Sequence, residues 1–273
     1  MTTKNISQLK GEKWIIGMVH LDALPGTPKN KLTIELIARK AIEEAKILER
    51  AGIDAIMIEN MHDVPYLKKH VGPEIVACMT AVATGIRKFI QIPVGIQILA
   101  AANREALAVA LAAQLDFIRV EGFVFAHLAD EGYLESCAGE LLRYRKMIGA
   151  EHILIFTDIQ KKHSSHAITS DLSLKDQIET ADYFLSDGVI ITGTSTGKEA
   201  LVEDVKTAWQ TTKLPVLIGS GITLDNIQSY WNFADAFIVG SWFKNEGDWK
   251  NKIAKDRVVQ FMKKVQELRN GNC

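Results

Sequence analysis

Residues 213–243 read KLPVLIGSGITLDNIQSYWNFADAFIVGSWF and contain two short apolar runs, Pro215–Ile218 and Ala236–Val239. Each run is bounded by glycine or proline, which is typical of a strand buried on both faces of a parallel sheet. A glycine-serine turn follows each run, and glycine there lets backbone N–H groups approach a ligand. Either the glycines only turn the chain, or the pair forms the anion site found after strands seven and eight of (β/α)8 barrels. The predicted phosphate-binding residues are Gly219, Ser220, Gly221, Gly240 and Ser241.

Strand and helix patterns alternate along the rest of the chain. Apolar runs typical of buried strands lie at residues 14–21, 54–58, 93–99, 116–121, 153–158 and 188–192. Helical spacing or capping signals follow each strand, including a predicted helix at 198–212 and a last one at 254–268. Residues 122–136 are expected to form a long loop, and residues 1–13 a polar N-terminal extension. Eight such units in 273 residues favour a single-domain (β/α)8 barrel over an open sheet.

Composition excludes several functional classes. A net charge of −1 gives no electrostatic support for nucleic-acid binding. The three cysteines are odd in number and lack CxxC spacing, so neither a disulfide framework nor a zinc knuckle is indicated. No apolar run approaches the length of a membrane span, and residues 1–13 lack the apolar core of a signal peptide. We therefore expect a cytoplasmic protein, and the sequence leaves homo-oligomer formation open.

Polar side chains follow the strands at the end where a barrel places its chemistry. Arg119 and Glu121 share a face with Phe117, which predicts that both charges face the lumen and need partners there. Each of these side chains also has a structural interpretation, such as capping a helix or pairing with a lysine. The predicted substrate-binding residues are His20, Asn60, Gln97, Arg119 and Thr192.

Two chemistries suit the ionisable groups of this set. Glu59, Glu121 and Asp158 could together hold Mg2+, which prefers oxygen ligands. Alternatively, one carboxylate is a general base, and Lys162 or His163 supplies an acid or a stabilising charge. We expect Asp158 and Lys162 to act as a pair at the rim of the barrel. The predicted catalytic residues are Glu59, Glu121, Asp158, Lys162 and His163, and no spacing indicates a structural metal site.

Six ordered segments resemble the BtpA/SgcQ family across nearly the whole chain. They are GMVHLDALPGTP, IENMHDVPY, FIRVEGFVFAHLADEG, DIQKKHSSHAITSD, VIITGTSTG and LIGSGITLDN. The resemblance implies a phosphate-binding (β/α)8 barrel. Many members have IRVN where this chain has Glu121 at the last position, and DVxVKHA where it has DIQKKHS at 158–164. Asp158, Lys162 and His163 therefore match the family pattern, whereas Glu121 departs from it.

The resemblance and the residues together predict a protein that binds a small phosphorylated ligand. The favoured function is a sugar-phosphate isomerase, lyase or aldolase. The family's namesake, implicated in accumulation of photosystem I proteins, implies an alternative, a non-catalytic assembly or maturation factor. A third interpretation is an FMN-binding barrel that uses the same glycines for the flavin phosphate.

Overall fold

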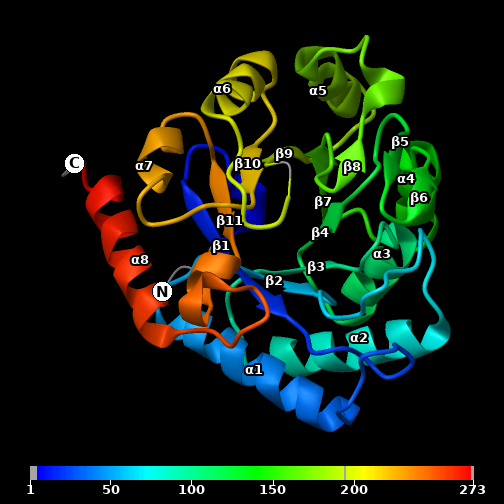
Figure 1. The fold of residues 1–273 in the computed structure, drawn as a ribbon, viewed down its shortest axis with the longest axis vertical. Coiled ribbons are helices and arrows are strands. Elements are labelled where there is room, and N and C mark those ends of the chain that lie inside the picture. The colour runs from blue at the N-terminus through cyan, green and yellow to red at the C-terminus, as the bar shows by residue number, and fades with distance from the viewer. Residues whose placement is uncertain (1–4, 194, 272–273) are drawn as a thin grey trace.

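A computed structural model describes residues 5–193 and 195–271. Eight parallel strands close into a barrel in the order β1-β11-β10-β9-β7-β4-β3-β2. Figure 1 shows the helices forming a ring around these strands. The barrel strands are β1 (Trp14–His20), β2 (Ala55–Glu59), β3 (Val94–Gln97), β4 (Phe117–Val120), β7 (Leu154–Ile159), β9 (Gly188–Thr192), β10 (Val216–Gly219) and β11 (Ala236–Val239). The predicted fold class is therefore confirmed.

The helices follow the strands in the expected alternation. They are α1 (Ile34–Arg50), α2 (Pro73–Arg87), α3 (Asn103–Ala112), α4 (Ala138–Met147), α5 (Leu174–Tyr183), α6 (Val202–Thr211), α7 (Ile227–Tyr230) and α8 (Lys255–Arg269). Short 3-10 turns are η1 (Ile6–Gln8), η2 (Ala167–Thr169), η3 (Ser241–Phe243) and η4 (Asn245–Gly247). Among the described residues, no helix is long and apolar enough to cross a membrane.

Side chains alternate between two cores along each strand. On β1, Ile16 and Met18 belong to a cluster inside the barrel, whereas Ile15 and Val19 pack in the larger cluster that includes the surrounding helices. This is the two-residue period of a strand with both faces buried. Ile6 and Leu9, which precede β1, are buried in the inner cluster. The described part of the N-terminal segment therefore packs against the barrel.

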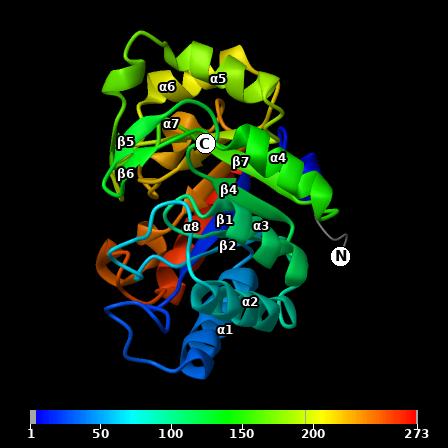
Figure 2. The same cartoon turned by 90° about the vertical axis from the view of Figure 1, so that its right-hand side faces the viewer.

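Residues 122–136 contain two strands instead of only a loop. These are β5 (His127–Ala129) and β6 (Gly132–Leu134), and β8 (Ser164–Ser165) completes a small antiparallel sheet in the order β6-β5-β8. The sheet ties the segment after β4 to the segment after β7. Figure 2 shows β5 and β6 on the side of the molecule opposite the labelled N-terminus.

Candidate functional site

The carboxyl ends of the barrel strands surround a pocket of about 260 Å³, which we call the central pocket. Strand β1 pairs with β2 so that His20 lies opposite Glu59, and both side chains line this pocket. Four of the five predicted phosphate-binding residues line it from the ends of β10 and β11, of which β11 pairs with β1. The predicted residues that line the central pocket are His20, Glu59, Arg119, Lys162, Ser220, Gly221, Gly240 and Ser241.

Arg119 and Asp158 form a buried ion pair within the barrel. Arg119 Nε donates to Asp158 Oδ1 at 2.8 Å, and its second nitrogen, Nη2, donates to Oδ2 at 2.9 Å. Their side chains are 4% and 0% exposed. Arg119, and not Lys162, therefore makes the hydrogen bonds to Asp158 in the described chain, and the predicted joint action of Asp158 and Lys162 stays a prediction. The predicted need of Arg119 for a partner inside the lumen is met by this bidentate contact.

His20 and Glu59 form a close pair in the central pocket whose pKa values are shifted in opposite directions. His20 Nε2 lies 3.5 Å from Glu59 Oε2, and His20 Nδ1 lies 3.2 Å from the Trp249 carbonyl oxygen. Because a carbonyl oxygen only accepts, Nδ1 carries the proton of the neutral ring and Nε2 presents a lone pair toward Glu59. Burial lowers the pKa of His20, with a further contribution from the Lys244 charge, and burial raises the pKa of Glu59. Both groups are therefore driven toward their neutral forms.

Lys162 is the residue where three cavities meet. Its ammonium group donates to Ser220 Oγ at 3.1 Å, on the loop after β10. It lines the central pocket and two larger cavities, which also share Lys161 with each other. Burial and the nearby Arg119 charge lower the pKa of Lys162, while the Glu59 and Asp158 charges oppose that shift. An amine in this position can contact a ligand in any of the three cavities.

Lys161 forms a second buried cluster that the sequence did not predict. Its Nζ lies 3.2 Å from Glu131 Oε2 and 3.8 Å from Glu121 Oε1, and all three side chains are at most 9% exposed. Glu121 Oε2 also accepts from the Ala101 backbone N–H at 2.9 Å. The only sequence signal was that Lys161 precedes Lys162, because Glu131 is contributed by the loop between β5 and β6.

The three predicted Mg2+ ligands do not form one site. Asp158 is paired with Arg119, and Glu59 faces His20. Glu121 forms an ion pair with Lys161 and accepts a hydrogen bond from the Ala101 backbone. Across residues 5–193 and 195–271, no three His, Cys, Asp or Glu side chains gather closely enough to hold a metal ion. These carboxylates therefore act as partners of protein cations and of a histidine.

The glycines of the two turns are required by neighbouring protein atoms as well as by any ligand. A Cβ on Gly221 would lie 2.3 Å from the Glu199 backbone nitrogen, and one on Gly240 would lie 3.3 Å from the His20 ring. A Cβ on Gly219 would meet Ile190 at 2.8 Å, and Gly219 does not line the central pocket. The close approach of residues 198–199 to Gly221 also explains why the helix predicted at 198–212 begins only at Val202.

The remaining predicted residues lie around the pocket rather than in it. Asn60 is buried and accepts from the Leu99 backbone N–H at 2.8 Å, which gives it a structural contact. Gln97 is buried at the end of β3, and its Oε1 has no hydrogen-bond partner within the described chain. His163 is exposed, and its Nε2 accepts from the Thr196 backbone N–H at 3.1 Å. Thr192 lines a neighbouring cavity.

A cavity of about 430 Å³ adjoins the central pocket and shares Glu59, Lys162 and two further residues with it. We call it the Trp249 cavity, because Trp249 and Tyr66 form one wall with Met61 and Leu99. The other wall is charged and combines the carboxyl groups of Glu59, Glu121, Asp130 and Glu131 with Lys161 and Lys162. No sequence pattern indicated Trp249, which reaches the mouth from the segment after η4 and contacts His62 at a ring-centroid distance of 5.0 Å.

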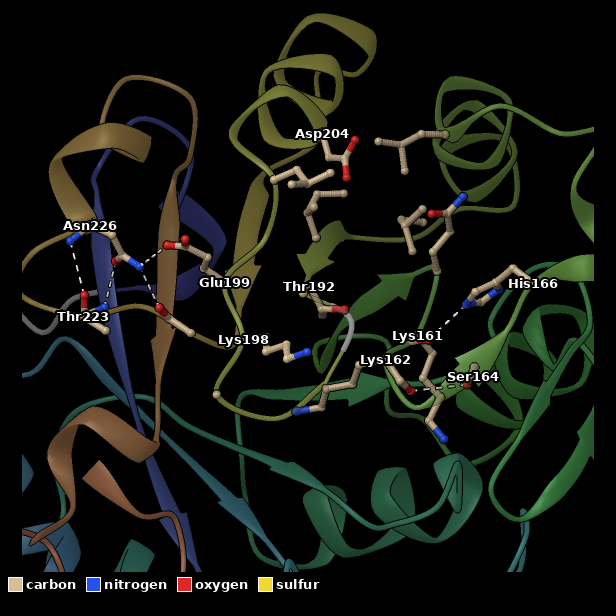
Figure 3. Close-up of a pocket in the computed structure, with 18 of the residues that line it drawn as sticks. Lys161, Lys162, Ser164, His166, Thr192, Lys198, Glu199, Asp204, Thr223 and Asn226 are labelled. Carbon is tan, nitrogen blue, oxygen red and sulfur yellow. Dashed lines mark hydrogen bonds between the residues drawn. The ribbon is translucent and has the colours of Figure 1, made fainter. Parts of the chain in front are cut away.

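A larger cavity of about 800 Å³, the outer cavity, lies beyond the strand ends of β7 and β9, and Leu174 and Asp204 line it from the first turns of α5 and α6. Figure 3 shows its lining, with Lys162 and Lys198 in the lower part of the view and Asp204 at the top. It shares Lys162, Gly197, Gly221 and Thr223 with the central pocket. The three cavities therefore adjoin one another at Lys162.

Fold and site together define a (β/α)8-barrel protein whose carboxyl strand ends surround a polar pocket. The BtpA family matches residues 11–267, and the chain belongs to this family. An uncharacterized protein of Caenorhabditis elegans, whose name calls it mitochondrial, is 48% identical over 93% of this chain and 94% of its own length. The photosystem I biogenesis protein BtpA of Synechocystis is 34% identical over 93% of this chain and 88% of its own.

Solved structures with low sequence identity share the fold. Thiamine phosphate pyrophosphorylase from Pyrococcus furiosus superimposes with a TM-score of 0.59 at 12% identity, covering 96% of this chain and 98% of its own. N-(5′-phosphoribosyl)anthranilate isomerase from the same organism superimposes with a TM-score of 0.59 at 13% identity, covering 94% of this chain and 100% of its own. These likenesses support the barrel architecture alone.

Proposed function

We propose that this protein is an enzyme that moves protons on a small phosphorylated sugar, as an isomerase, lyase or aldolase does. The observation that carries the proposal is the His20–Glu59 pair, which lines the same pocket as Lys162 and both glycine-serine turns. The pocket thus combines an acid–base pair with groups that suit a phosphate. Phosphorylated compounds in the names of the structural neighbours are consistent with this use of the fold.

The phosphate would lie against the turns after β10 and β11. Gly240 and Ser241 open the 3-10 turn η3, and the first N–H groups of a helical turn have no partner within it. Ser220 and Gly221 approach from the neighbouring strand, where the Lys162 ammonium already binds Ser220 Oγ. A phosphate there would receive backbone donors and one full positive charge, which is how proteins commonly hold this group.

The proton chemistry follows from the tautomer of His20. Its Nε2 lone pair accepts a proton from the substrate, and the neutral carboxylic acid of Glu59 donates one to an oxygen or nitrogen of the reacting centre. Lys162 stabilises negative charge that develops on a substrate oxygen. Arg119 lines the pocket, and its pair with Asp158 adds a fixed dipole without exchanging protons. The lowered pKa of His20 keeps its ring neutral and able to accept a proton, and the raised pKa of Glu59 favours the protonated acid that donates one.

The Trp249 cavity suits the sugar itself. An aromatic face packs against the C–H face of a sugar ring, while carboxylates accept hydrogen bonds from its hydroxyl groups. Trp249 provides the aromatic face, and oxygens of the Glu59 and Asp130 carboxyl groups line the same cavity next to Lys162. We therefore assign the hydroxyl-bearing part of the ligand to this cavity.

A second candidate function is that of an assembly factor, which the name of the Synechocystis relative supports. NMR separates the two candidates. Aldose and ketose phosphates, nucleoside 5′-monophosphates and FMN are incubated with the protein in D2O, and 1H and 31P spectra are followed. We expect conversion or deuterium incorporation with at least one compound, and a loss of about a hundredfold or more in His20→Gln and Glu59→Gln. Wild-type protein that leaves every compound unchanged would favour the assembly role.

A further inference from the structure

The outer cavity is large enough to hold a part of the ligand that the central pocket cannot. Ligand pockets for whole small molecules are commonly about 300–1,000 Å³. The central pocket, at about 260 Å³, is below this range, whereas the outer cavity has about 800 Å³. Since Lys162 and Gly221 line both, a ligand with its phosphate in the central pocket can extend into the outer cavity.

Aliphatic side chains form much of the outer cavity's surface. Ile159 and Ile191 come from the ends of β7 and β9, and Leu174 and Leu201 lie at the beginnings of α5 and α6. Leu201 is 69% exposed, although it is a large apolar residue beside a cavity. A flat ligand with apolar faces would remove this surface from water, which is favourable in proportion to the area covered. A free sugar, with hydroxyl groups all around its edge, would gain much less.

Some polar groups of the outer cavity bond to one another, as Asn226 does to Glu199, but two side chains have no such partner among the described residues. Thr192 Oγ1 is buried and makes no hydrogen bond to any described residue. No hydrogen bond or ion pair to the Asp204 carboxylate is found over residues 5–193 and 195–271, and burial raises the pKa of this group. In Figure 3, Thr192 lies between Asp204 and the two lysines, Lys162 and Lys198. Acceptors and donors at separate points around an apolar cavity suit a ring with hydrogen-bonding groups on its edge.

We infer that the outer cavity binds a nitrogen heterocycle of the nucleobase type, so that the substrate is a phosphorylated sugar carrying such a ring. The inference rests on the proposed function, because the phosphate must lie in the central pocket. Asp204 would accept from an amino or ring N–H group, and Thr192 would bond another edge atom. Ile191, Leu174 and Leu201 would cover the faces of the ring. The ligand would then be a nucleoside 5′-monophosphate or a close analogue.

The Trp249 cavity is the competing place for the ring, because an aromatic side chain also stacks on a heterocycle. Its other wall carries four carboxylates, which suits the hydroxyl groups of a sugar better than a second apolar face. The outer cavity is about twice as large and has aliphatic residues from both neighbouring helices. The two assignments differ in which variants lose affinity for the ring.

Calorimetric titration of the full-length protein tests the inference. The probes are inorganic phosphate, ribose 5-phosphate and the four common ribonucleoside 5′-monophosphates. We expect at least one nucleotide to bind about tenfold or more tightly than ribose 5-phosphate. In Leu201→Ser and Asp204→Ala this advantage should fall to about threefold or less, while the affinity for ribose 5-phosphate stays unchanged. Leu201 is the N-cap residue of α6, a position that favours serine, so Leu201→Ser should keep the fold.

Leu185→Ser is the matched control, since Leu185 is 70% exposed and lies outside the three cavities. It should bind all probes like the wild type. Equal affinity for ribose 5-phosphate and all four nucleotides overturns the inference and leaves the proposed function standing. A nucleotide advantage that survives both variants but is lost in Trp249→Ala places the ring over Trp249 and also overturns it. If no phosphorylated probe binds, the proposed function fails as well.

Discussion

Replacing Asp158 with asparagine should destabilise the fold substantially. In wild type, the Asp158 carboxylate binds both Nε and Nη2 of Arg119, and neither side chain is more than 4% exposed. The substitution leaves a buried guanidinium without its counter-charge, which costs about 3–5 kcal/mol. For a domain of this size, that loss corresponds to a decrease in Tm of roughly 6–20 °C.

Chemical denaturation followed by circular dichroism gives the free energy of unfolding directly. The matched control is Glu151→Gln, which breaks the pair between Lys146 and Glu151 on the surface, where the lysine side chain is 80% exposed. We expect no measurable change there. The double variant Arg119→Met with Asp158→Leu should be more stable than Asp158→Asn, because it removes both charges. An Asp158→Asn protein as stable as the Glu151→Gln control would refute the assignment of a buried pair.

Three further predictions concern other parts of the molecule. The pKa of His20 is lowered in the folded state, so as pH falls through about 6.5 the unfolded chain takes up a proton first and the folded state loses stability. His20→Gln should therefore show a smaller decrease in Tm between pH 7 and 5 than the wild type. A decrease equal to that of the wild type would contradict the buried neutral ring. Gly221→Ala should lower the free energy of unfolding more than Gly52→Ala in denaturant titrations. Both glycines have positive φ, but only at Gly221 would the added Cβ lie 2.3 Å from a backbone atom, the nitrogen of Glu199. Equal losses of free energy would show that the Glu199 backbone is not packed there. Leu9→Ala should lower the free energy of unfolding by about 2–5 kcal/mol, since Leu9 is fully buried in the inner cluster. A loss below about 1 kcal/mol would contradict the packing of the N-terminal segment against the barrel.

The barrel and the residues at its mouth could be predicted because both depend on local patterns. Apolar runs of four to six residues indicate where the strands lie. Because the strands are parallel, the residue that follows each run lies at the carboxyl end of the barrel. His20, Glu59 and Ser220 were found in this way and line one pocket. Side-chain alternation also placed Arg119 in the lumen correctly.

The pairings at the mouth could not be predicted, because they depend on how neighbouring strands are staggered. Arg119 pairs with Phe156 in the register of β4 and β7, which places Asp158, the next inward residue of β7, within reach of the guanidinium. Lys162 is four residues from Asp158 in sequence, but the chain turns toward β10 and brings it to Ser220. Trp249 comes from a segment that folds back over β1, so no local pattern indicates its contact with His20.

The phosphate site is the central claim, and a calorimetric comparison of ribose 5-phosphate with ribose tests it most directly. The wild type should bind ribose 5-phosphate and show no detectable binding of ribose. Ser241→Asp, which adds a negative charge to the turn after β11, should weaken ribose 5-phosphate binding at least tenfold, by about 1.4 kcal/mol or more. Ser229→Asp, on the exposed side of α7, should bind like the wild type. Equal binding of ribose and ribose 5-phosphate, or full affinity in Ser241→Asp, would contradict a phosphate site at these turns.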